Sequence, residues 1–96
     1  MNSQSNIVTL RKEKREFADL SYCYELSTEN TEDFKKSNCF CISIELRCNG
    51  SKTTCFKKQK FKCEEKANEF FDMIVENLVT PLNLPYVIAD EILNYI

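Results

Sequence analysis

The sequence predicts an α+β fold, in which a three-stranded antiparallel meander is covered on one face by two C-terminal helices. Residues 20–26 and 39–47 alternate apolar and polar side chains with a period of two, which is typical of half-buried strands. Residues 63–96 instead carry apolar side chains at spacings of three and four, which indicates amphipathic helices. A chain of 96 residues has room for one domain with a modest core.

The N-terminal segment, residues 1–16, is polar and basic, and we expect a flexible arm that precedes a single domain at residues 17–96. Within this arm, residues 7–10 (Ile-Val-Thr-Leu) are apolar enough to add a short edge strand, which would make the sheet four-stranded. The first six residues show no signal-peptide pattern, and no apolar run approaches the roughly 18 residues that span a bilayer. We therefore expect a cytoplasmic protein without a membrane partner.

Two strands and a loop follow. Leu20, Tyr22, Tyr24 and Leu26 mark one face of the first strand, and residues 27–38 are polar and rich in turn formers, which predicts a loop. The second strand has an apolar face made by Phe40, Ile42, Ile44 and Leu46.

Asn49-Gly50 predicts a hairpin to a third strand at residues 53–62. A two-residue turn would pair residues whose numbers sum to 99, which would put Phe56 on the side away from Ile42 and Ile44. An even sum instead brings Phe56 to the apolar face. Because the hydrophobic face usually fixes strand register, we expect a three-residue loop with Gly50 in a bulge.

Two helices end the chain. The first begins near residues 63–65 and ends at or before Thr80, because Pro81 disfavours helical backbone in the residue before it. The second begins at Asn83 or Leu84, with Pro85 in its first turn, where a missing N–H costs little. Its apolar stripe is Leu84, Val87, Ile88, Ile92, Tyr95 and Ile96.

The composition argues against enzyme chemistry and against a cofactor. The chain has no His, so it lacks Ser-His and Cys-His pairs and histidine metal ligands. Its single Gly excludes the phosphate-binding loop and the dinucleotide fingerprint. Nothing in the sequence indicates a small-molecule substrate, and we expect a protein that is not an enzyme.

Charge is unevenly distributed along the chain, although the net charge is only −2. Residues 52–62 hold five lysines and no acid, and residues 63–96 hold seven acids and one lysine. The lysine run is typical of a protected edge strand. It is also compatible with an anionic partner, so an alternative function is a DNA-transaction accessory factor. The residues of that alternative are Arg11, Lys12, Lys14, Arg15, Lys57, Lys58, Lys60 and Lys62.

The six cysteines leave three interpretations open. In a reducing cytosol they act as small hydrophobic residues. A disulfide framework is a second interpretation, although no secretory signal accompanies it. The third is a metal or redox sensor, for which the even register gathers Cys23, Cys39, Cys41 and Cys55 on one sheet face. The spacings contain no Cys-x-x-Cys pair.

Several motifs resemble one family. These are Tyr22-Cys23-Tyr24, the Ile42-Ser43-Ile44 strand, and an ending that reads Val-Thr-Pro-Leu-Asn-Leu-Pro-Tyr-Val-Ile-Ala-Asp over residues 79–90. Together they resemble a family of small, uncharacterised proteins (a domain of unknown function) from clostridia and related Firmicutes. The resemblance covers residues 20–93. It implies a bacterial cytosol, reduced thiols and a non-enzymatic accessory role, with no activity to transfer.

We therefore expect a small interaction or regulatory protein whose C-terminal helix contacts an unknown protein partner or a second copy of the chain. The residues expected at this contact are Tyr86, Ile92, Tyr95 and Ile96. On this hypothesis Ile92→Asp abolishes the contact and leaves the monomer folded.

Overall fold

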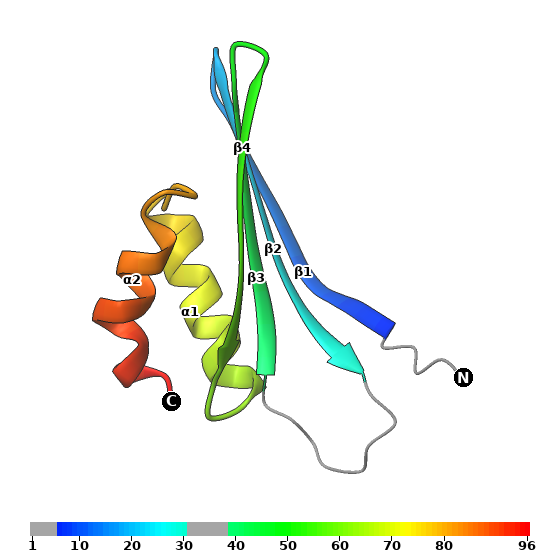
Figure 1. The fold of residues 1–96 in the computed structure, drawn as a ribbon, viewed down its shortest axis with the longest axis vertical. Helices are drawn as coiled ribbons and strands as arrows, with labels where there is room; N and C mark the ends of the chain where they lie inside the picture. The colour runs from blue at the N-terminus through cyan, green and yellow to red at the C-terminus, as the bar shows by residue number, and fades with distance from the viewer. Residues whose placement is uncertain (1–5, 31–38) are drawn as a thin grey trace.

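The structure is a computed structural model that describes residues 6–30 and 39–96. Four strands form one antiparallel sheet in the order β1-β2-β3-β4, and two helices follow (Figure 1). The strands are β1 (Asn6–Glu16), β2 (Leu20–Asn30), β3 (Cys39–Cys48) and β4 (Ser51–Lys60). Both helices lie on one side of the sheet (Figure 1), so the α+β meander with C-terminal helices is confirmed, with four strands.

The N-terminal segment differs from the expected flexible arm. Residues 6–16 form β1, which pairs with β2 from Asn6↔Asn30 to Glu16↔Ser21 and shifts register between Thr9 and Arg11. Charged side chains on both faces obscured this strand in the sequence, because an edge strand does not need to alternate apolar and polar residues. Strand β2 likewise continues to Asn30, four residues into the segment expected to be a loop; residues 1–5 and 31–38 lie outside the described residues.

The β3–β4 register corrects the prediction of a three-residue loop. Strand residues pair as Ser43↔Phe56 and Ile44↔Cys55, so their numbers sum to 99 and the turn has two residues. Asn49 and Gly50 both have positive φ, 51° and 85°, as a type I′ turn requires. The twist of this turn matches that of the strands, and the local turn geometry therefore determined the register. Cys55 faces the helices, and Phe56 is 55% exposed on the opposite side.

Helix α1 (Glu64–Glu76) begins with two acids, which suit the positive end of the helix dipole. Helix α1 ends at Glu76, four residues before Thr80, the last position that Pro81 would allow. The Val79 N–H donates to the Ile74 carbonyl at 3.0 Å and the Leu78 N–H donates to the Val75 carbonyl at 3.1 Å, the bond pair of a Schellman cap. Leu78 has the left-handed φ of 51° that this cap needs.

Helix α2 (Leu84–Glu91) has Pro85 in its first turn, as expected, and passes into a 3₁₀ turn, η1 (Ile92–Asn94). The α-helix is therefore shorter than the apolar pattern suggested. No helix among residues 6–30 and 39–96 is long and apolar enough to cross a membrane.

The core lies between the helices and one face of the sheet. Tyr24, which is fully buried, donates a hydrogen bond from its hydroxyl to the Val79 carbonyl at 3.0 Å, which joins β2 to the segment between the helices. The pKa of Tyr24 is raised to about 12, mainly because the side chain is buried and to a smaller extent because Tyr22 lies beside it. The buried residues that form this core cluster are Tyr22, Tyr24, Leu26, Phe40, Ile42, Ile44, Phe61, Ala67, Phe70, Phe71, Ile74, Val75, Val79 and Leu84.

Candidate protein-docking surface

Helix α2 and η1 bury one side against the core. Leu84 is fully buried, and Val87, Ile88, Ile92 and Tyr95 pack against the core while half-buried. The Tyr95 ring meets Phe70 edge-on with 5.2 Å between ring centroids. The Lys62 N–H donates to the Tyr95 carbonyl at 3.1 Å, so the C-terminal segment is also held to the end of β4.

The side of residues 82–93 that faces away from the core, which comprises α2 with the turn before it and η1 after it, is apolar as well. Leu82 is 76% exposed, Tyr86 is 71% exposed and Leu93 is 78% exposed, and Ala89 between them is also exposed. These four residues, which we call the outer stripe, are spaced by four, three and four positions. Leu82 lies in the turn before α2, Tyr86 and Ala89 lie in α2, and Leu93 lies in η1. Their spacing is that of a helix–helix seam and places them along one side of this segment.

The chain entering α2 holds the outer stripe in place. The Asn83 N–H donates to the Thr80 carbonyl at 3.1 Å, with the Thr80 Oγ1 at 3.3 Å. The Leu84 N–H donates to the same carbonyl at 3.0 Å, and Pro81 is buried. Leu82 is therefore fixed one turn before Tyr86 by the backbone bonds around it.

The four residues expected at the contact divide between the two sides. Tyr86 belongs to the outer stripe, whereas Ile92 and Tyr95 pack inward. Ile96 is 54% exposed and lines a depression of about 290 Å³ beside the end of β4, together with Phe61 and its neighbours. Because Ile92 packs against the core, we now expect Ile92→Asp to destabilise the monomer, whereas the sequence alone suggested a folded variant.

Sequence reasoning missed Leu82, Ala89 and Leu93. Their spacing with Tyr86 was visible in the sequence as a second apolar row, on the side opposite Leu84 and Ile88. Two apolar rows on one short helix are the signal that could have identified the surface, since a helix with a single covered side carries one row.

The charged residues that lie along α2 itself are acidic. After Lys66 the chain contains no Lys or Arg, and every charged side chain beyond it is a carboxylate. Lys66 itself forms an ion pair with Glu69 at 3.3 Å. Asp90 and Glu91 occupy the last turn of α2, where the negative end of the helix dipole disfavours them and where no basic residue is present.

The structure spreads the residues of the anionic-partner alternative over both sides of the sheet. Directly paired residues on neighbouring strands lie on the same face of the sheet. Arg11, Arg15 and Lys57 therefore lie on the helix side, because their cross-strand partners are the core residues Leu26, Tyr22 and Ile42. Lys12, Lys14, Lys58 and Lys60 lie on the other side, and Lys62 follows β4.

Several of these cations are already paired within the fold. Arg11 lies 2.7 Å from Asp72 and 4.9 Å from the centre of the Phe71 ring, so it joins β1 to α1. Arg15 pairs with Glu13 at 3.3 Å. Lys14 pairs with Glu16 at 3.0 Å, and this hydrogen bond raises the pKa of Lys14.

The cysteines of the sensor alternative do not share one face. Cys23, Cys39 and Cys41 lie on the open side of the sheet, whereas Cys55 faces the helices because of the corrected register. Cys23 and Ser27, the cross-strand partner of Cys41, are four residues apart on β2, roughly 13 Å at strand spacing. Among the described residues no group of three or more His, Cys, Asp or Glu could hold a metal ion.

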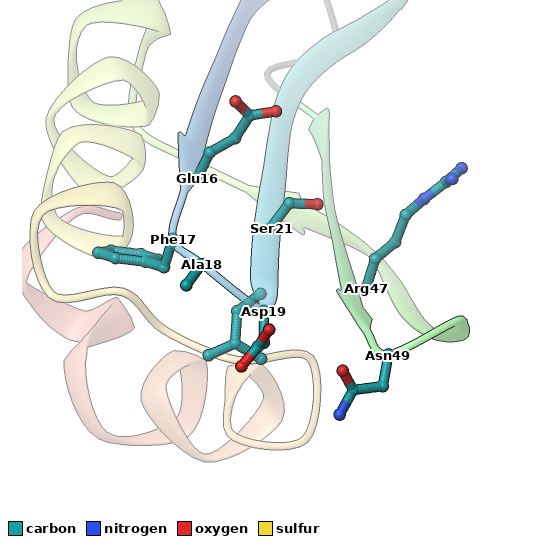
Figure 2. Close-up of a pocket in the computed structure, with 8 residues that line it drawn as sticks. Glu16, Phe17, Ala18, Asp19, Ser21, Arg47 and Asn49 are labelled. Carbon is teal, nitrogen blue, oxygen red and sulfur yellow. The ribbon is translucent and has the colours of Figure 1, made fainter.

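A solvent-open depression of about 470 Å³ lies at the β1–β2 turn (Figure 2). Its charged groups do not converge on one point. Arg47 is held by Glu45 at 2.6 Å, which raises the pKa of Arg47 and lowers that of Glu45. The Asp19 carboxylate and the Arg47 guanidinium point away from each other (Figure 2). The depression therefore offers no arrangement of acid, base and nucleophile.

Comparison with known proteins identifies the domain. A model of a family of unknown function (DUF6514) matches residues 4–94, a span that contains every strand and helix of the structure. The chain belongs to the DUF6514 family. No curated protein and no solved structure matches it. Membership in DUF6514 confirms a small domain of unknown function, and the outer stripe must be interpreted from its own chemistry.

Proposed function

We propose that the chain is a non-enzymatic interaction protein that docks a helix of another protein onto the outer stripe of α2. One observation supports this proposal. Leu82, Tyr86 and Leu93 are each more than 70% exposed and lie in one row along residues 82–93, a segment whose opposite side is already packed. Single exposed apolar residues are ordinary, but a contiguous row is typical of a binding surface.

The form of the surface favours a helix as the occupant. The four-three-four spacing is the one by which two helices interlock side chains. In recognition of this kind an amphipathic helix anchors through residues at i, i+3, i+4 and i+7. A cytoplasmic accessory or regulatory role agrees with this proposal and with the family resemblance.

Site-specific photo-crosslinking in the cells that make the protein tests the proposal. A benzoylphenylalanine replaces Tyr86 in the outer stripe or, as a matched control, Phe56, an exposed aromatic residue on the other side of the sheet. We expect a discrete crosslinked product from position 86 and none from position 56. Absence of a product from position 86, or a product from position 56 alone, would overturn the proposal.

A further inference from the structure

We infer that the partner helix is basic, and that a second copy of this chain does not occupy the outer stripe. The inference rests on the proposed function and adds the chemistry of the occupant. Its geometric basis is the apolar row Leu82, Tyr86, Ala89 and Leu93, with carboxylates as the charged neighbours of that row along α2.

The first argument is charge complementarity. Asp90 directly follows Ala89 of the stripe, and Glu91 and Glu76 are exposed at the ends of α2 and α1. A helix that covers the apolar row brings its own flanking residues close to Asp90. Lysine or arginine at those positions gains attraction, whereas acids are repelled.

The second argument is that these acids oppose local stability. Carboxylates in the last turn of a helix interact unfavourably with the helix dipole, and α1 and α2 both end with acids and no base. The Asp90 side chain forms no hydrogen bond or ion pair with any residue that the structure describes, whereas the Glu91 carboxylate accepts a hydrogen bond from the Asn94 amide at 3.3 Å. Neither the stability of α2 nor a contact within the chain explains a carboxylate at position 90, whereas attraction to a cation on a partner explains it.

The same charges argue against a homodimer through this surface. In a two-fold contact each residue meets the same patch of its partner. Because residues 67–96 contain no cation, an outer stripe packed on its own copy would bring the two Asp90 carboxylates together with no cation from α2 or η1 to compensate them. Like charges placed this way disfavour the self-pairing that the apolar row alone would permit.

The test uses two labelled synthetic peptides that present the same leucine heptads, one flanked by lysines and the other by glutamates. Fluorescence anisotropy reads their binding to the full chain. We expect the lysine peptide to bind with an affinity that falls as salt is raised, and the glutamate peptide not to bind. Equal binding of the two peptides, or binding of neither, overturns the inference.

Two variants separate docking from simple charge attraction. Leu93→Asp adds a negative charge, so adsorption by charge alone would tighten lysine-peptide binding, whereas docking on the stripe predicts its loss. The double variant Asp90→Lys with Glu91→Lys keeps the apolar row. We expect it to bind the lysine peptide with roughly tenfold lower affinity and to gain affinity for the glutamate peptide. The helix dipole favours these lysines, so the fold is retained.

The crosslink at position 86 distinguishes failure of this inference from failure of the proposed function. A crosslinked product at twice the 11.3 kDa chain mass identifies a second copy of this chain, which overturns both the basic-helix inference and the docking of another protein. A product with a different protein, together with no preference for the lysine peptide, overturns the inference alone. Loss of the product overturns both.

Discussion

At the scale of single residues, Arg11 is a basic side chain whose contacts lie within the domain. It lies over the Phe71 ring and pairs with Asp72, whereas the next residue, Lys12, lies on the opposite face of β1 and is exposed. We expect Arg11→Ala to lower the free energy of unfolding by about 1–2 kcal/mol through loss of the cation–π and ionic contacts. Lys12→Ala should change it by less than about 0.5 kcal/mol. Equal effects in urea unfolding would contradict this assignment.

Tyr24 gives a prediction with a defined pH range. Tyr24→Phe removes the hydrogen bond to the Val79 carbonyl and should cost about 1 kcal/mol at neutral pH. Burial raises the pKa of Tyr24 from 10.0 to about 12. Between these values the unfolded chain has released the proton that the folded chain retains, so stability falls as pH rises, by roughly 2–3 kcal/mol in total.

The phenylalanine variant lacks that ionisation and serves as the control for every other group that titrates at high pH. We expect the stability difference between wild type and Tyr24→Phe to shrink and reverse between pH 10 and pH 12. Parallel curves across this range in chemical unfolding would show that Tyr24 does not titrate as a buried group.

At the scale of elements, the register of β4 is tested by two phenylalanines. Phe56 lies on the open side of the sheet and Phe61 is buried in the core. Phe56→Ala should cost less than about 1 kcal/mol and Phe61→Ala about 3–5 kcal/mol. Comparable losses in thermal unfolding would favour the even register, which places Phe56 against Ile42 and Ile44.

The same elements show which parts of the fold can be predicted from the pattern of apolar residues in the sequence. Strands with one buried face, β2 and β3, were predictable because alternation reports burial directly. The edge strands β1 and β4 were harder, since charged residues lie on both of their faces and turn geometry at Asn49-Gly50 determines the pairing. Helix α2 was predictable, but its exposed apolar side was not, because periodicity alone does not say which of two apolar rows is covered.

At the scale of the whole molecule, two consecutive residues divide between the core and the outer stripe. Ile92 packs inward and Leu93 is 78% exposed. We expect Ile92→Asp to unfold the domain, because an unpaired carboxylate would enter the core, whereas Leu93→Asp should leave the thermal midpoint within a few degrees of wild type. A large drop for Leu93→Asp would mean that Leu93 contributes to the fold instead of to a partner.

Crosslinking from position 86 in a chain that also carries Leu93→Asp tests the central claim most directly, with circular dichroism confirming that the variant is folded. If a partner docks on the outer stripe, the product formed without Leu93→Asp disappears when Leu93 is charged. A folded variant that still gives the product in undiminished yield would contradict docking on the stripe.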